Sequence, residues 1–380
     1  MKKIILISAF FILLFPNNGM AEELISNAKS GILIEANSGK IIFEKEKDME
    51  VSVASMTKMV AQIIILEEIE KGNIHWDDIV TVSKNASDMG GSQIYLEQGE
   101  KITIEDLMKG ISVASGNDAT VAMAELISGT EEKFVKRMND VVKRLNLSHT
   151  HFMNSTGLDE DNHYSSAYDM AMIARELVLK HSEILKFSSI YEDYLREDSD
   201  RKFWLVNTNK LIGQYEGADG LKTGHTDNSG YCLAATAKRD NYRLIGIVLG
   251  EDNSKIRNQE TMELLDYGFS NTKFKVLKKK GTIIKEIVIP NSKEKKLKIG
   301  LKEDLGVVEE VNDNNTYQYE IKIFNYQIPL NKGDKIGIIR VKKDKNVVME
   351  NDLVSMNEIT PMSYFELLIE NGKNLLLGQL

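Results

Sequence analysis

The chain has 380 residues, of which 42% are hydrophobic and 28% are charged. This length is enough for two or three domains, and this apolar fraction is enough for at least one substantial core. The formal net charge is −9 and no long basic tract occurs, which argues against a nucleic-acid-binding protein. We therefore expect an acidic globular protein that has no nucleic acid among its partners.

The first 21 residues form a predicted secretory signal peptide. Lys2 and Lys3 precede an apolar run from Ile4 to Phe15, and a short polar stretch then ends at the small residue Ala21. Because a membrane-spanning helix needs about 20 apolar residues, the short run favours cleavage after Ala21 over a membrane anchor. The mature chain is expected outside the cytoplasm, in the periplasm or on the extracytoplasmic face of the cytoplasmic membrane.

The chain has a single cysteine, Cys232, which lies in the apolar run 231–235. One cysteine cannot form an internal disulfide, so the stability of an exported protein of this composition must come from its core. The run predicts a strand, and a buried inert thiol rather than a nucleophile.

Residues 22–270 predict a mixed α/β domain. Two strand-like runs, 31–36 and 40–44, flank the turn residues 37–39 and predict a hairpin. Apolar residues at helical spacing then predict a helix over 55–71. Caps and apolar periodicity predict further helices from Thr103, over 131–145 and from Ser166 to about Lys180. Two strands and a last helix are expected over 231–238, 243–249 and 255–267.

The composition changes beyond residue 271, where short β-branched runs alternate with charged residues. These runs lie at 282–290, 296–301, 317–329 and 335–341. They predict a small antiparallel β domain over residues 271–358.

Residues 359–380 predict an amphipathic helix. Phe365, Leu368 and Ile369 lie on one face, and Glu366 and Glu370 lie on the opposite face. The charges prevent this helix from spanning a bilayer, so we expect it to bind a membrane surface. The alternative is packing of the same face against the β domain or a partner.

The first candidate catalytic motif is the pair Ser55 and Lys58. Positions i and i+3 share one face of a helix, so the lysine amine can reach the serine hydroxyl. A serine at a helix N-terminus also lies beside unpaired N–H groups that favour negative charge. The same spacing occurs at four other places, Ser26, Ser199, Ser270 and Ser292, but only Ser55 opens a long apolar-periodic helix.

Two further motifs follow in the chain. Ser115-Gly116-Asn117 lies in a glycine-containing loop between two helical stretches, where its hydroxyl and amide can both face a cleft. Lys222-Thr223-Gly224 opens the strand-rich part, and its glycine allows a substrate backbone to approach the strand closely. Each motif alone is more often a helix cap, a turn or a strand start. The three together, in this order, point to serine acyl-transfer chemistry.

This trio resembles the active-site signature of penicillin-binding proteins and serine β-lactamases. The longer strings 54–59 (ASMTKM) and 219–226 (DGLKTGHT) resemble the low-molecular-weight D-alanyl-D-alanine carboxypeptidases in particular. The resemblance covers nearly all of the mature chain. The β domain and the terminal helix match the family in their architecture rather than in a sequence motif. It implies an α/β (α+β) catalytic domain, with an antiparallel sheet flanked by helices and a helical subdomain, followed by a small all-β domain.

The resemblance also implies catalytic roles. Ser55 is expected to attack the carbonyl of the penultimate D-alanine of a peptidoglycan stem peptide and to form an acyl-enzyme. Lys58, with its pKa lowered by burial and by the cation of Lys222, is expected to take the proton of the serine. Ser115 is expected to pass a proton to the leaving D-alanine. β-Lactam antibiotics are expected as covalent inhibitors.

The remaining site residues are expected to bind the substrate. Asn117 would orient Lys58 and the substrate amide, and the backbone N–H groups of Ser55 and His225 would form the oxyanion hole. The terminal carboxylate would be held beside the motif that begins at Lys222. The residues expected there are Lys222, Thr223, Gly224 and Arg257. An arginine that the family has shortly before this strand is replaced here by Thr208.

Other interpretations remain open at this point. His149 and His151 suggest a metal site, but no third ligand is evident, and we expect neither a metal nor a cofactor. A β-lactamase of the class A type would need a Glu-x-x-x-Asn string between Ser115 and Lys222, and none occurs. A DD-endopeptidase would share every motif. A non-catalytic peptidoglycan-binding protein would not need Ser55, Lys58 and Lys222.

Overall fold

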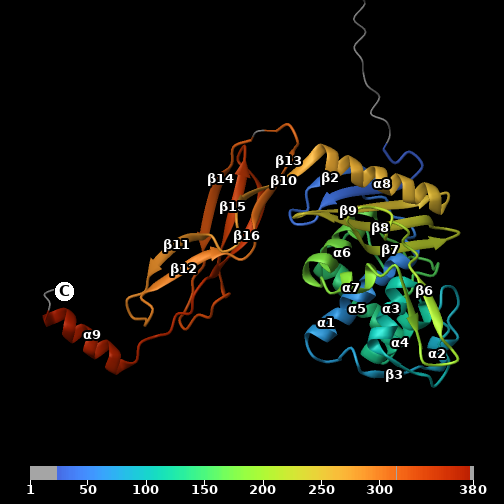
Figure 1. The fold of residues 1–380 in the computed structure, drawn as a ribbon, viewed down its shortest axis with the longest axis horizontal. Coiled ribbons are helices and arrows are strands. Elements are labelled where there is room, and N and C mark those ends of the chain that lie inside the picture. The colour runs from blue at the N-terminus through green and yellow to red at the C-terminus, as the bar shows by residue number, and fades with distance from the viewer. Residues whose placement is uncertain (1–23, 314, 377–380) are drawn as a thin grey trace, which may run out of the picture.

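The structure of the protein, a computed structural model, describes residues 24–313 and 315–376. The predicted signal peptide therefore lies outside the described residues. The chain forms an α/β region followed by a β region, and a last helix lies at the end of the β region that is remote from the α/β region (Figure 1). This arrangement is the fold class that the sequence predicts.

The α/β region is built on a five-stranded antiparallel sheet with the order β2-β1-β9-β8-β7. Its strands are β1 (Ser30–Glu35), β2 (Ile41–Lys45), β7 (Ala218–Thr226), β8 (Gly230–Arg239) and β9 (Tyr242–Glu251). Strand β1 pairs with β9, so the first and last strands of this region lie side by side. Strand β7 lies at one edge of the sheet and carries the Lys222 motif.

Both faces of this sheet are buried. Successive side chains of a strand point to opposite faces, and here Ile32 and Ile34 join the core shared with the helical subdomain while Leu33 joins a second core. The second core is covered by α8 (Ser254–Asn271), which packs on β8 and β9. The sheet is thus the middle layer between α8 on one face and the other helices on the opposite face (Figure 1).

The helical subdomain is inserted between β2 and β7. Its helices are η1 (Ala54–Thr57), α1 (Lys58–Glu70), α2 (Lys84–Ser87), α3 (Ile104–Val113), α4 (Asn117–Ser128), α5 (Glu131–Arg144), α6 (Ala167–Lys180) and α7 (Ile184–Ser188). The side chains of Thr103 and Ser166 cap α3 and α6 by accepting from the N–H groups three residues later, at 3.1 and 3.2 Å, which confirms the predicted helix starts. The first nine residues of α1 are all buried, so α1 is the central helix of the subdomain.

The structure corrects the predicted start of the helix over 55–71. Residues 54–57 form the 3₁₀ turn η1, and the α-helix α1 begins only at Lys58. In a 3₁₀ turn the side chains at i and i+3 eclipse each other, so the geometric argument for Ser55 and Lys58 still holds. Two short two-stranded ribbons were not predicted. In the first, β3 (Ile79–Thr81) pairs with β4 (Lys101–Thr103), and in the second, β5 (Glu192–Leu195) pairs with β6 (Phe203–Val206).

The β region begins where α8 ends and forms one five-stranded sheet, β11-β12-β16-β15-β14, and one two-stranded ribbon, β10-β13. The strands are β10 (Thr272–Lys278), β11 (Ile283–Val288), β12 (Lys296–Leu301), β13 (Leu305–Glu310), β14 (Gln318–Ile323), β15 (Lys335–Lys343) and β16 (Asn346–Ser355). A separate core of Leu, Ile and Val side chains joins them, which makes this region a domain of its own.

The last helix, α9 (Tyr364–Leu376), is attached to the β domain by its polar face. Glu366 pairs with Lys293 at 3.4 Å, and Glu370 pairs with Lys295. The apolar side chains remain open, since Phe365 is 75% exposed and Leu368 is 58% exposed. Among the described residues, no helix is both long and apolar enough to cross a membrane.

Candidate active site

The three sequence motifs meet where the helical subdomain contacts strand β7. The turn η1 packs directly on β7. This close approach requires the glycine at position 224, because a Cβ there would lie 2.5 Å from the carbonyl oxygen of Val53. The third residue of the Lys222 motif must therefore be glycine for the turn that carries Ser55 to pack on β7.

Ser55 is half-buried and its hydroxyl contacts the amine of Lys58. The Lys58 Nζ lies 2.9 Å from Ser55 Oγ, 2.6 Å from Asn117 Oδ1 and 2.6 Å from the carbonyl oxygen of Thr156. The Lys58 side chain is completely buried. The Ser55 hydroxyl can thus be reached from solvent, while the Lys58 amine cannot.

These three contacts fit a neutral amine. Burial, and then the cation of Lys222, hold the pKa of Lys58 well below its usual value, and the carboxylate of Asp118 opposes them. A neutral amine has two hydrogens and one lone pair. The carbonyl oxygens of Asn117 and Thr156 can only accept, so they take the two hydrogens. The lone pair then faces the Ser55 hydroxyl, which becomes the donor, and Lys58 is placed to act as its base.

A second serine–lysine pair lies beside the first. Lys222 donates to Ser115 Oγ at 2.8 Å and to its neighbouring carbonyl, that of Thr223, at 2.9 Å. Burial and the nearby Arg257 lower the pKa of Lys222 to about 7. Ser115 has a φ of 64°, a conformation that non-glycine residues rarely adopt, and this backbone turns its hydroxyl toward β7. The loop is held by Asn117, whose amide donates to the carbonyl of Gly90 at 2.7 Å.

Gly157 supports the catalytic turn from behind. Its φ is 83°, and a Cβ on it would lie 1.9 Å from the carbonyl oxygen of Ala54 and 3.0 Å from the backbone nitrogen of Ser55. Ala54 itself has a φ of 46°. The peptide unit that leads into Ser55 is therefore strained and tightly enclosed, which fixes the Ser55 N–H in one direction.

A buried histidine orders the same turn. His163 accepts from the backbone N–H of Met153 through Nδ1 at 3.2 Å, so its proton lies on Nε2, which is 2.8 Å from Thr57 Oγ1. Burial lowers the pKa of His163 to about 4, so the ring is neutral at physiological pH. Sequence patterns gave no signal for His163, Thr156 or Gly157, which lie in an irregular segment about a hundred residues beyond Ser55.

The other candidate substrate residues lie on or near β7. The Thr223 hydroxyl donates to the hydroxyl of Thr208 at 2.8 Å, so the residue that replaces the expected arginine contacts the motif. The His225 ring is exposed and lies against the Tyr231 ring, with 4.0 Å between centroids. Arg257 is buried, it donates to the side chain of Asn258, and it lies close enough to Lys222 to lower the pKa of that lysine.

The two histidines that suggested a metal are engaged separately. His149 Nδ1 lies 3.0 Å from a carboxylate oxygen of Glu50, and His151 Nδ1 lies 2.8 Å from the carbonyl oxygen of Asn162. Over residues 24–313 and 315–376, no group of three or more potential metal ligands comes together. Cys232 is buried, and burial raises the pKa of its thiol to about 11, so it is unsuited to act as a nucleophile.

The site contains two serine–lysine pairs. In the first, a half-buried serine on a 3₁₀ turn contacts a buried lysine, and the second lies at the edge of an antiparallel sheet. This arrangement defines a serine acyl-transfer enzyme of the penicillin-binding type. Comparison with known proteins gives the family. Residues 18–253 match the family of D-alanyl-D-alanine carboxypeptidases, and residues 272–361 match the C-terminal domain of penicillin-binding protein 5. The chain belongs to the D-alanyl-D-alanine carboxypeptidase family.

Individual relatives agree over almost the full length. The chain is 44% identical to D-alanyl-D-alanine carboxypeptidase DacF of Bacillus subtilis over 91% of this chain and 89% of that protein. It is 32% identical to DacA of Escherichia coli K12 over 90% of this chain and 86% of that protein. The structure is similar to penicillin-binding protein 5 from Haemophilus influenzae, with a TM-score of 0.71 and 32% identity over 88% of this chain and 98% of that one.

Proposed function

We propose that this protein is a serine-type D-Ala-D-Ala carboxypeptidase that removes the terminal D-alanine from peptidoglycan stem pentapeptides. The observation that carries the proposal is the contact of Ser55 Oγ with the amine of Lys58, buried and low in pKa, at 2.9 Å. Such a lysine can accept a proton at neutral pH, which an ordinary lysine cannot. The relatives DacF and DacA are named for this activity.

The geometry supports a two-step mechanism. In the first step Ser55 Oγ bonds to the carbonyl carbon of the penultimate D-alanine, and its proton passes to Lys58 Nζ. The N–H groups of Ser55 and His225 stabilise the oxyanion. The C–N bond then breaks, and the proton held by Lys58 passes through Ser115 to the nitrogen of the leaving D-alanine, which makes Lys58 neutral again. In the second step water attacks the ester, Lys58 accepts the water proton, and Ser55 recovers its hydrogen.

The neighbours of the two serines bind the substrate in this proposal. Asn117 already donates and accepts at once, so its amide is fixed in one orientation that can also contact a substrate amide. Lys222 and Thr223, with Gly224 beside them and Arg257 behind, provide the positive charge and hydroxyl that a terminal carboxylate needs. Thr208 bonds to Thr223 here, so it orients this hydroxyl rather than supplying a charge of its own.

β-Lactams are expected to acylate the same serine. A relative, penicillin-binding protein D2 from Listeria monocytogenes, has been solved in ampicillin-bound and cefotaxime-bound forms, at 29% identity. In an opened penicillin the leaving amine stays tethered and obstructs the path of water, and no Glu-x-x-x-Asn string supplies a dedicated base for the ester. The penicilloyl enzyme should therefore be long-lived.

A fluorescent penicillin tests the proposal. The wild-type protein should retain the label on a denaturing gel, and mass spectrometry should place it on the tryptic peptide that contains Ser55. Ser55→Ala should lose the label and remain folded. If the protein hydrolyses penicillin in many fast turnovers without a trapped adduct, it is a β-lactamase instead. If the wild-type protein is not labelled at all, the remaining interpretation is a non-catalytic peptidoglycan-binding protein.

A second assay tests substrate preference. Release of D-alanine from a pentapeptide, compared with cleavage of a crosslinked peptide dimer under the same conditions, separates a carboxypeptidase from an endopeptidase. We expect the pentapeptide to be cleaved faster. Preferential cleavage of the dimer would make the protein an endopeptidase.

The location of the enzyme is also a proposal. Export by a signal peptide ending at Ala21 would place the domains 22–270 and 271–358 outside the cytoplasm, with residues 359–380 as the membrane contact. The ion pairs of Glu366 and Glu370 support this, because they hold α9 by its polar face and leave the apolar face open. Truncation after Thr360 should move the protein from the membrane fraction to the soluble envelope fraction, and identical fractionation of both forms would refute the contact.

A further inference from the structure

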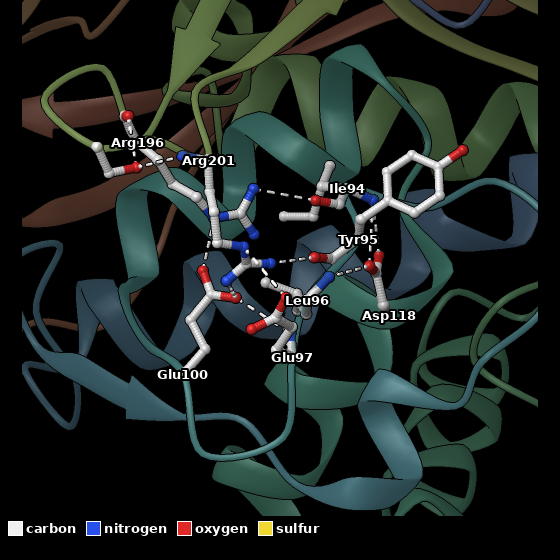
Figure 2. A network of polar contacts seen from close by, with 9 residues as sticks. Ile94, Tyr95, Leu96, Glu97, Glu100, Asp118, Arg196 and Arg201 are labelled. Carbon is white, nitrogen blue, oxygen red and sulfur yellow. Dashed lines mark hydrogen bonds and ion pairs between the residues drawn. The ribbon is translucent and has the colours of Figure 1, made fainter.

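Asp118, the residue after the Ser115–Asn117 motif, is buried at the start of α4. Its carboxylate accepts hydrogen bonds from the backbone N–H groups of Ile94 at 3.1 Å and Leu96 at 3.0 Å (Figure 2). It also accepts from the backbone N–H of Ala119 at 2.8 Å. Charged side chains are rarely buried to this degree unless they are fully bonded. The bonds to Ile94 and Leu96 join the N-terminus of α4 to a segment more than twenty residues earlier.

That segment, residues 90–100, which we call the strap, is also bound to Asn117. The backbone N–H of Asn117 donates to the carbonyl of Ser92 at 2.7 Å, and the side-chain amide donates to the carbonyl of Gly90 at 2.7 Å. The Oδ1 of the same amide accepts from Lys58 at 2.6 Å. A displacement of the strap would therefore turn the amide that orients the catalytic amine.

The opposite side of the strap is held by the segment that joins β5 and β6. Arg196 donates to the carbonyl of Ile94 at 3.1 Å and to Glu100 at 2.6 Å. Arg201 donates to the carbonyl of Tyr95 at 2.8 Å and to Glu100 at 2.9 Å. In Figure 2 these guanidinium groups and Asp118 contact the strap from two sides, so the strap is held between the β5–β6 ribbon and the catalytic loop.

Asp118 also acts on Lys58 through its charge. Three ionisable groups face the Lys58 amine: Asp118 on α4, Lys222 on β7, and His163, whose ring is neutral at physiological pH. Burial and Lys222 lower the pKa of Lys58, and Asp118 alone among these neighbours raises it. Removal of the Asp118 charge therefore lowers the pKa of Lys58 further.

We propose that Asp118 is a positioning residue for acyl transfer, which fixes the strap and through it the orientation of Asn117 toward Lys58. The proposal rests on the proposed function, since it assigns a role within the same site. The proposal gives Glu100 a lesser positioning role, because Glu100 fixes the far side of the strap. Glu100 is not among the groups that shift the pKa of Lys58.

The test compares three variants by the rate of acylation with a fluorescent penicillin as a function of pH. In Asp118→Asn one carboxylate oxygen becomes an NH₂ group, which can only donate. In one orientation of the amide it faces the N–H groups of Ile94 and Leu96, and in the other it faces those of Ile94 and Ala119, so a donor meets a backbone donor in both. We expect acylation at neutral pH to fall by a factor of ten or more, since small displacements of catalytic groups cost up to about 10²-fold. The acidic limb of the pH profile should move to lower pH, because the base is neutral over a wider range.

The other two variants separate charge from position. Glu100→Gln weakens the far side of the strap without changing the charge near Lys58, so acylation should be slower while the acidic limb stays in place. Glu125→Gln makes the same chemical change on the same helix, at a residue whose carboxylate accepts from the side chain of Asn85 at 2.9 Å, and should behave as wild type.

The outcomes are decisive in each case. A wild-type rate and pH profile in Asp118→Asn overturns the inference, as does a loss that only follows the fraction of unfolded protein measured by circular dichroism. If Asp118→Asn does not fold, Glu100→Gln decides, and a wild-type rate in that variant overturns the inference. Failure of the wild-type protein to acylate would instead overturn the proposed function, and the positioning role with it.

Discussion

Alanine at Gly157 should have two effects: the general cost of a side chain at positive φ, and the loss of support for the turn that carries Ser55. A matched glycine elsewhere in the chain separates the two. Gly157 has a φ of 83°, and Gly129, at the end of α4, has a φ of 80°. A Cβ at 129 would meet nothing within 4 Å, whereas a Cβ at 157 would lie 1.9 Å from the carbonyl oxygen of Ala54. Gly129→Ala is therefore the matched control, because it has the backbone strain without the collision.

The expected losses of stability follow from the backbone strain and from the collision. A left-handed conformation costs an L-residue roughly 1–2 kcal/mol, so both variants should lose about that much stability. The collision in Gly157→Ala adds about 1–3 kcal/mol, as overpacking does in other cores. The carbonyl of Ala54 must also move, and the backbone nitrogen of Ser55 moves with it, so acylation should fall by about 10² or more in Gly157→Ala alone.

The assay combines denaturant unfolding with the rate of labelling by a fluorescent penicillin on protein that is still folded. Gly129→Ala should label at the wild-type rate, and Gly157→Ala should label much more slowly while its folded fraction remains high. Equal labelling rates in the two variants would refute the argument that Gly157 fixes the position of the Ser55 N–H.

Three further predictions concern ionisable groups. Lys58→Arg should stay folded but lose acylation, because a guanidinium is never neutral at working pH, and near-native labelling would place the base elsewhere. Lys222, with a pKa of about 7, loses its charge as the pH rises through that value, so the KM for a D-Ala-D-Ala peptide should increase between pH 6 and pH 9, and a constant KM would contradict its role in holding the carboxylate. Burial, and then the neighbouring carboxyl of Glu260, raise the pKa of Glu251 to about 8. The folded state therefore binds this proton more tightly than the unfolded state, and stability is lost as the pH rises from about 4.5 through about 8. Thermal unfolding of Glu251→Gln should depend less on pH over that range than that of wild type, and parallel curves would refute the assignment.

The large elements of the fold could be predicted from the sequence because their periodicity is strong. The helices α5, α6 and α8 follow the predicted ranges within four residues, and so do β8 and β9. Weaker patterns were missed. Strand β16 carries charged residues within its apolar run, and β5 and β6 are four-residue strands separated by a polar segment, so neither gives a clear alternation.

The site shows a similar division. Ser55, Lys58, Ser115 and Lys222 could be predicted because their chemistry resides in side chains at recognisable spacing. Thr156 contributes only a carbonyl oxygen to Lys58, across 98 positions of sequence, and Gly157 contributes only the absence of a side chain. Contacts of the backbone over such separations depend on tertiary packing, which no local pattern reports.

The position of β7 has a consequence for the proteins that share a compartment with this one. An unpaired edge strand offers its backbone to any extended chain that reaches it. Here η1 lies so close to this strand that position 224 has no room for a Cβ, and the Thr208 hydroxyl bonds to Thr223 beside it. These two contacts hold the middle of the strand in place beside the catalytic turn. We expect an extended chain end to pair with this edge beside Lys222 and Thr223, and a folded protein, whose chain is already paired within its own sheets and helices, to escape hydrolysis.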